Sequence, residues 1–252
     1  MIRNLIVHCY PRKSGKWRRT LRHLERAWGQ FTGRKIITIA HDECCSAPAE
    51  VAREWPADCE IIIKPNDRPL QEVASFVPML ERVESRDPDE FTTYVHCKGA
   101  TQPDGHASHL WCDGMAAANL DYPQLLECLF ASGKNIVGAF RSHGLWSFPG
   151  YHNWHYAGTW FTFRNSRIFG ELDWRNINQD FMGVEAWPGI VPVEESGCLF
   201  YDNANTAHLY NLDFWRDNIT LSLKHWRKSL EKCGLKPYGK EMLAIREPLA
   251  VS

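Results

Sequence analysis

The segment most suggestive of chemistry is residues 94–101, YVHCKGAT, where an apolar run ends in a histidine and a lysine. Successive side chains of a strand point to opposite faces, so His96 and Lys98 share one face. Gly99 allows the chain to turn tightly after them. A cation at the carboxyl end of a strand, beside a glycine loop, is suited to bind a diphosphate. The alternative is a solvated Lys98 and a hydrogen-bonded His96 at the strand edge.

A candidate acid lies further along the chain. The segment 154–164, WHYAGTWFTFR, is followed by Glu185, which stands between Gly183 and Trp187. Small and aromatic neighbours can desolvate a carboxylate and raise its pKa toward that of a general base. A glutamate in a loop is more often simply solvated. We therefore treat Glu185 as a candidate base that the tertiary structure must support.

Aromatic side chains are concentrated in residues 141–160, and the chain has 11 tryptophans in total. The interspersed glycines and prolines predict a loop there. A tryptophan ring offers a flat apolar face that can stack on a sugar or a nucleobase, and it can equally pack in a core. Trp146, Trp154 and Trp160 are the candidate stacking residues.

Histidines give a weaker indication of a metal site. The spacing of His152 and His155 could hold a metal ion, and His208, shortly before the last expected helix, could be a metal ligand or a phosphate donor. No HExxH motif is present, and the adjacent Cys44 and Cys45 are poor partners for one zinc ion. A metal-dependent hydrolase is thus an alternative with little support.

The elements that position these residues alternate between strand and helix periodicity over the first 140 residues. This alternation predicts an α/β protein with a mostly parallel sheet, helices on both faces, and one domain over residues 1–252. Strands are expected at 4–9, 35–40, 59–64, 92–96, 135–140, 159–164 and 191–194. Helices are expected at 17–31, 49–55, 69–83, 111–131 and 213–233. Ligands of such sheets bind beyond the strand ends, here 9–12, 41–43, 64–67 and 96–101.

Composition excludes several classes of protein. The net charge is −1, which disfavours a non-specific nucleic-acid binder. No apolar stretch approaches the roughly 20 residues of a membrane helix, and the apolar run near the start is too short for a secretory signal. The nine cysteines include no CxxC pair, so we expect them to be reduced, in a cytoplasmic protein. The GxGxxG, GxxxxGK[ST] and GxSxG motifs are absent.

Taken together, the order and spacing of these motifs resemble the GT-A nucleotide-sugar glycosyltransferases, especially bacterial polysaccharide enzymes of the rhamnan-synthesis type. The matching segments are His96–Gly99 before a long helix, then 157–164, AGTWFTFR, and then Glu185 before the turn at 187–189. By motif the resemblance covers residues 90–215, and by element order it covers the first 90. It implies a single GT-A-like domain, with a nucleotide-binding half at 1–140 and an acceptor and catalytic half at 141–252.

The resemblance implies a nucleotide-diphosphate sugar as donor and a carbohydrate or glycoconjugate as acceptor. Glu185 would take the acceptor proton, and Asp42 would contact the uridine or ribose. Lys98 and His96 would hold the diphosphate, and Arg164, which ends its motif, joins the substrate-binding candidates. At the strand end where the family holds Mn²⁺ or Mg²⁺ with an Asp-x-Asp motif, this chain has His96, Cys97 and Lys98, so Lys98 would neutralise the leaving group in place of the metal.

The sequence also allows other functions. The same fold could bind a nucleotide sugar or a carbohydrate without turnover, as the lack of an Asp-x-Asp motif at that strand end suggests. The aromatic segment could instead be a protein-binding surface. As an enzyme of polysaccharide or glycoconjugate synthesis, the protein would act in the cytoplasm, either free or peripheral to the inner membrane.

Overall fold

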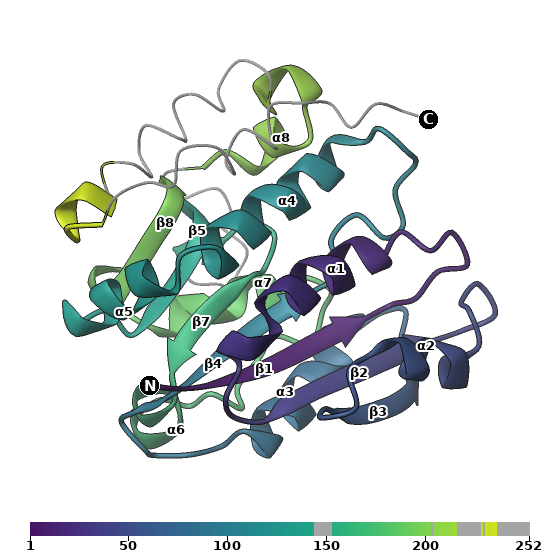
Figure 1. Ribbon diagram of the computed structural model, residues 1–252, viewed down its shortest axis with the longest axis horizontal. Coiled ribbons are helices and arrows are strands. Elements are labelled where there is room, and N and C mark those ends of the chain that lie inside the picture. The colour runs from purple at the N-terminus through teal and green to yellow at the C-terminus, as the bar shows by residue number, and fades with distance from the viewer. Residues whose placement is uncertain (144–152, 203, 216–227, 229, 236–252) are drawn as a thin grey trace.

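A computed structural model describes residues 1–143, 153–202, 204–215, 228 and 230–235 (Figure 1). The first half of the chain forms a parallel sheet in the order β3-β2-β1-β4. Its strands are β1 (Ile2–Cys9), β2 (Lys35–His41), β3 (Glu60–Pro65) and β4 (Glu90–His96). Its helices are α1 (Arg18–Ala27), which a 3-10 turn at Trp28–Gln30 extends, α2 (Pro48–Glu54) and α3 (Val73–Arg82). These elements confirm the predicted alternation.

The second half adds strands of both directions. β7 runs antiparallel between β4 and β5, β6 pairs antiparallel with β5, and β8 pairs parallel with β5. The strands are β5 (Ile136–His143), β6 (Trp154–Tyr156), β7 (Phe161–Arg164) and β8 (Ser196–Asp202). The helices are α4 (Ala107–Leu120), α5 (Pro123–Ala131), α6 (Asn165–Glu171), α7 (Gly183–Ala186) and α8 (Thr206–Leu209), with 3-10 turns at Trp187–Ile190 and Val193–Glu195. Six of the eight strands, β1–β5 and β8, run in one direction, and β6 and β7 run against them, so the sheet is mostly parallel, as predicted.

Helices cover both faces of the sheet (Figure 1), and a layer of buried hydrophobic side chains lies on each face. Alternation along β1 sends Leu5 and Val7 into the layer under α1, α4 and α5, and Ile6 into the layer under α3, α6 and α7. All three side chains are fully buried. The molecule is thus an α/β protein with helices on both faces of one central sheet, as predicted.

The predicted helix over 111–131 is wrong as one element. The chain forms α4 and α5, which are separated at Asp121 and Tyr122. Pro123 lies at the start of α5, where a missing N–H costs nothing, whereas inside a helix its ring would clash with the preceding turn.

The aromatic segment is not wholly a loop. Part of it belongs to β5 and part to β6. The strand β6 has three residues and is held in place by its pairing with β5. The strand predicted at 191–194 is instead a 3-10 turn followed by β8. Of the helix predicted at 213–233, residues 213–215, 228 and 230–232 are helical, and residues 216–227 and 229 lie outside the described residues.

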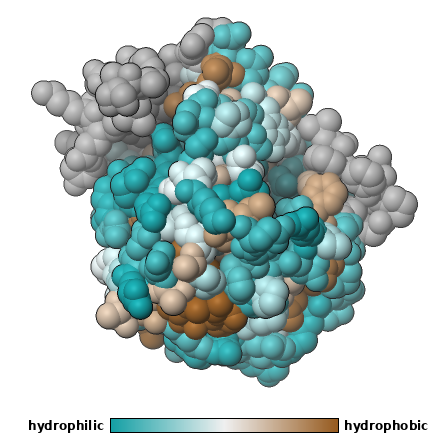
Figure 2. Space-filling model, turned by 90° about the vertical axis from the view of Figure 1, so that its right-hand side faces the viewer, coloured by the Kyte–Doolittle hydropathy of each residue, from teal (hydrophilic) through white to brown (hydrophobic). Residues whose placement is uncertain are grey.

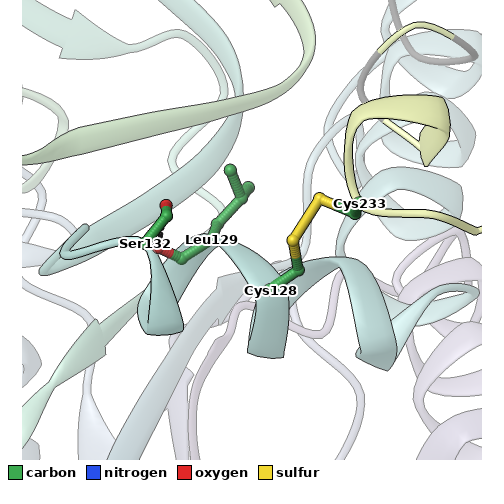
Figure 3. Close-up of a disulfide and its surroundings, with 4 residues drawn as sticks. All are labelled: Cys128, Leu129, Ser132 and Cys233. Carbon is green, nitrogen blue, oxygen red and sulfur yellow. Dashed lines mark hydrogen bonds between the residues drawn. A yellow bond between two sulfur atoms is a disulfide. The ribbon is translucent and has the colours of Figure 1, made fainter.

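The prediction that all cysteines are reduced is wrong. Cys128 of α5 and Cys233 form a disulfide across a sequence separation of 105 residues (Figure 3). Such a pairing has no signature in local spacing, because only the fold brings α5 beside the C-terminal segment. The other seven cysteines are free thiols. The cytoplasmic expectation therefore loses the support of fully reduced cysteines. Within the described ranges, no helix is both long and apolar enough to cross a membrane.

Candidate functional site

A cleft of about 650 Å³ lies at the carboxyl ends of the parallel strands. His8 and His96 lie side by side there, at the ends of β1 and β4. Figure 2 views the molecule from the side toward which β1 runs in Figure 1, and the surface there is mainly hydrophilic. The lining residues are His8, Tyr10, Arg12, Cys44, Asn66, Arg68, Gln71, Glu72, 96–102, Ser108 and Tyr210. The cleft thus opens at the edge where ligands were expected.

The charges around this cleft are predominantly positive. Arg12, Arg68 and Lys98 line it, against one carboxylate, Glu72. Arg68 also pairs with Glu43 and lies 3.8 Å from Asp42. Hydrogen bonding to Tyr10 raises the pKa of Arg12 above its ordinary value. This edge of the sheet is therefore suited to an anionic ligand.

Lys98 lies against two aromatic rings. Its ammonium is 3.8 Å from the centre of the Trp111 ring and 5.5 Å from that of Tyr210. Within the described part of the chain, no carboxylate lies within 4.0 Å of the ammonium. Trp111 is buried, whereas Tyr210 is 48% exposed. Lys98 therefore has its charge available to a ligand, and Tyr210 offers a ring beside it.

The inner part of the cleft is a buried polar cluster on α3, β1 and β4. Glu72 Oε1 lies 2.5 Å from His96 Nδ1, and its Oε2 accepts a hydrogen bond from the Tyr94 hydroxyl at 2.8 Å. Burial alone would raise the pKa of Glu72, but His96, His8 and Tyr94 outweigh it and lower that pKa to about 2. Glu72 is therefore an anion whose two oxygens are both engaged.

His8 differs from its neighbour His96. Its Nδ1 lies 2.7 Å from the hydroxyl of Ser75. Burial lowers the pKa of His8 to about 4, against an opposing effect of Glu72 and with further lowering by His96 and Lys64. His8 is thus neutral near pH 7.

The backbone that carries Glu72 is strained. Gln71 has φ = +47°, a conformation that costs a non-glycine residue free energy. The turn before it is closed by Asp67, whose carbonyl accepts from the Gln71 amide at 2.6 Å and whose carboxylate accepts from the Leu70 amide at 3.0 Å. This turn directs Glu72 toward β4, at the start of α3.

Asp42, the predicted ribose contact, is engaged by the protein. Its carboxylate accepts from the Tyr10 hydroxyl at 2.8 Å, the Cys44 amide at 2.9 Å and the Asn66 amide at 3.4 Å. The hydrogen bond from Tyr10 is the main reason that the pKa of Asp42 falls to about 2. These three partners line the cleft, so Asp42 fixes the loops that shape it.

Glu185, the predicted base, does not line this cleft. It belongs to the short helix α7, and its Oε1 lies 3.4 Å from the Gly158 amide and 3.9 Å from His155 Nε2. Gly158 has φ = +87°, and a Cβ there would lie 2.6 Å from Trp111 Nε1. Trp111 therefore lies between Lys98 and the backbone that Glu185 contacts.

The tryptophans predicted to stack on a ligand have other positions. Trp154 and Trp160 are 4% and 1% exposed, so their rings pack in the core. Their indole N–H groups donate to the carbonyls of Val191 and His96 respectively. Trp154 belongs to β6 and Trp160 directly precedes β7, and the two rings pack in the two hydrophobic layers on either side of the sheet. Trp146 lies outside the described residues.

Arg164 and His208 are not part of the cleft. Arg164 pairs in register opposite Phe91, near the start of β4, and donates to the carbonyls of Pro88 and Phe130. It therefore stabilises the opposite end of the sheet. His208 lies in α8, with its ring 5.9 Å from that of Phe214.

A metal site finds no support in the described residues, where no group of three His, Cys, Asp or Glu side chains could hold an ion. His152 lies outside those residues. Near the cationic side of the cleft, the one lining carboxylate is Glu72, and it is engaged with His96 and Tyr94. Mg²⁺ and Mn²⁺ prefer oxygen ligands, so the residues present do not fit them.

Sequence reasoning did not single out Arg12, Arg68, Glu72 or Tyr210, although Arg12 falls within a strand end predicted to bind the ligand. Arg12 and Arg68 lie in or just after predicted strand ends, so the charge of those loops could have identified them. Glu72 and Tyr210 had no signal, since each reaches the cleft from an element distant in sequence.

Comparison with known proteins gives distant likenesses. No family model and no curated protein matches the chain. Among solved structures, 4-diphosphocytidyl-2C-methyl-D-erythritol synthase aligns at 10% identity and a TM-score of 0.38, over 68% of this chain and 78% of that one. A protein from Desulfovibrio desulfuricans G20 assigned to the nucleotide-diphospho-sugar transferases aligns at 9% identity and a TM-score of 0.36, over 92% and 99%.

Proposed function

We propose that this protein is a transferase that binds a nucleotide-diphosphate sugar and passes the sugar to a hydroxyl acceptor. The observation that carries the proposal is the cationic cleft at the carboxyl edge of the sheet, where Arg12, Arg68 and Lys98 outnumber the one carboxylate. A diphosphate carries several negative charges, and guanidinium and ammonium groups are its usual partners.

Lys98 has the clearest role in this proposal. When the bond between the sugar and the diphosphate breaks, negative charge develops on the leaving phosphate oxygen. A cation held by packing against Trp111 is already in place and needs no reorganisation. The exposed ring of Tyr210 would stack on the base or the sugar of the same ligand.

No step is assigned to a divalent metal ion, because the lining residues do not fit one. We therefore expect nucleotide binding to persist in excess chelator. A loss of binding that added Mg²⁺ or Mn²⁺ restores would contradict this part of the proposal.

Glu185 stays a predicted base for the acceptor hydroxyl, but its position outside the described cleft counts against this role. Glu185→Gln keeps the shape of the side chain and removes its basicity. Under the original prediction this variant loses transfer and still binds the donor.

The same position of Glu185 favours a second candidate, a protein that binds nucleotide sugars without turnover. Calorimetric titration with nucleoside diphosphates, followed by incubation with the matching nucleotide sugars, separates the two. Release of nucleoside diphosphate supports a transferase, whereas binding without release supports the second candidate. The absence of binding to every nucleoside diphosphate would refute both.

A further inference from the structure

Buried His96 and partly exposed Glu72 have the arrangement of a base and the group that orients it. His96 is 7% exposed and lines the cleft. Its Nδ1 lies 2.5 Å from Glu72 Oε1, an ion-pair contact without hydrogen-bond geometry, and its Nε2, also buried, has no hydrogen-bond partner among the described residues. Buried polar atoms are nearly always paired, so an unpaired one at the wall of a cleft needs an explanation.

We infer that His96 is the general base of the transfer reaction and that Glu72 is its positioning residue. The inference rests on the proposed function and assigns the proton transfer to the cleft itself. A proton on Nδ1, the nitrogen beside the Glu72 carboxylate, leaves the lone pair on Nε2. Tyr94 engages the other oxygen of Glu72, which fixes the carboxylate in place.

The proposed step is a displacement at the anomeric carbon of the donor sugar. The acceptor O–H gives its proton to Nε2, and the oxygen forms a bond to the anomeric carbon. The bond from that carbon to the β-phosphate oxygen breaks, and its electron pair leaves with the nucleoside diphosphate. Glu72 stabilises the imidazolium that results, while Lys98 faces the leaving group.

The neighbouring groups are poorer bases. Glu72 has both oxygens engaged and a pKa of about 2. His8 has its Nδ1 on the Ser75 hydroxyl, and burial keeps its pKa at about 4. The strained turn at Gln71, immediately before Glu72, indicates that the position of this carboxylate is built at a cost in free energy.

Two substitutions at position 96 test the inference. In His96→Asn the amide nitrogen takes the place of Nδ1 and can still donate to Glu72, but Nε2 is lost. We expect turnover of the donor to fall about 100-fold or more, while the donor Kd stays within about threefold. In His96→Gly, added imidazole should restore turnover in proportion to its concentration, which a merely structural residue would not show.

Glu72→Gln tests the positioning role. It keeps an oxygen for Nδ1–H and removes the negative charge, so kcat should fall while the acceptor KM stays unchanged. The matched control is His23→Asn. His23 also lies beside a carboxylate, with Nε2 2.8 Å from Asp113, but it lies outside the cleft. We expect wild-type turnover from this control.

Each other result overturns the inference. If His96→Asn keeps wild-type turnover, His96 is not the base. The same holds if Glu185→Gln is the one variant that loses turnover. In both cases the transferase proposal still stands. Loss of fold in both position-96 variants, seen by circular dichroism, would make His96 structural. If the wild-type protein binds nucleotide sugars but never releases nucleoside diphosphate, no transfer takes place, and His96 has no proton to accept. A protein that binds no nucleotide would refute the proposed function itself.

Discussion

Replacing Lys98 by methionine removes the charge at the centre of the cleft and keeps the stem that packs on Trp111. Lys98 has no carboxylate partner among the described residues, so its substitution breaks no ion pair there. A charge-assisted contact to a phosphate contributes about 1.5–3 kcal/mol, which corresponds to about a 10- to 150-fold weaker Kd. The lost cation–π contact affects the free energy of unfolding by about 0.5–1 kcal/mol, so the variant should fold.

Isothermal titration with a nucleoside diphosphate and with the matching nucleoside measures this effect. Only the diphosphate should bind more weakly to Lys98→Met, and the difference should shrink at high salt, which screens charges. The matched control is Lys134→Met. Lys134 precedes β5, at the edge of the sheet opposite the cleft, and donates to the Glu194 carbonyl. A change below about threefold, or an equal loss for the nucleoside, would refute the role of Lys98 in phosphate binding.

Three further predictions concern stability and base recognition. Replacing Cys128 by serine opens a 105-residue loop and should lower the free energy of unfolding by up to about 4–5 kcal/mol, measured by urea denaturation; an unchanged midpoint would show that the disulfide with Cys233 does not form. Tyr210→Ala should weaken nucleoside diphosphate binding about 5- to 150-fold, with pyrophosphate binding unchanged and Tyr210→Phe near wild type, in titration calorimetry. Because burial lowers the pKa of His8 from 6.5 to about 4, the free energy of unfolding should decrease as the pH falls from 6.5 to 4, by up to about 3 kcal/mol. In His8→Asn the free energy of unfolding, taken from denaturation curves recorded between pH 6.5 and 4, should decrease less. An equal dependence on pH in the variant and the wild type would count against the burial of a neutral imidazole.

The alternation of strands and helices was predictable because it depends on local periodicity. Each buried strand of the first half is an apolar run, and each helix shows an apolar stripe. The same reasoning placed His96 and Lys98 together at a strand end, where the structure has them on the wall of one cleft.

Partners distant in sequence were not predictable. Glu72 reaches His96 through a strained turn, and Tyr210 reaches Lys98 from beyond β8. Trp154 and Trp160 are of a residue type that can stack on a ligand, but Trp154 of β6 and Trp160, which precedes β7, are buried in the two hydrophobic layers. Composition alone cannot distinguish an aromatic ring in a core from one that faces a ligand.

The sequence by itself therefore determined the layers, the succession of strands and helices along the first half of the chain and the edge at which polar groups gather, since these follow from the spacing of apolar residues. The tertiary structure alone decided which charges meet in the cleft, which histidine faces a carboxylate and which cysteines pair. The physical reason is that these contacts join segments many residues apart, and their distances are set by the packing of the whole sheet and its helices.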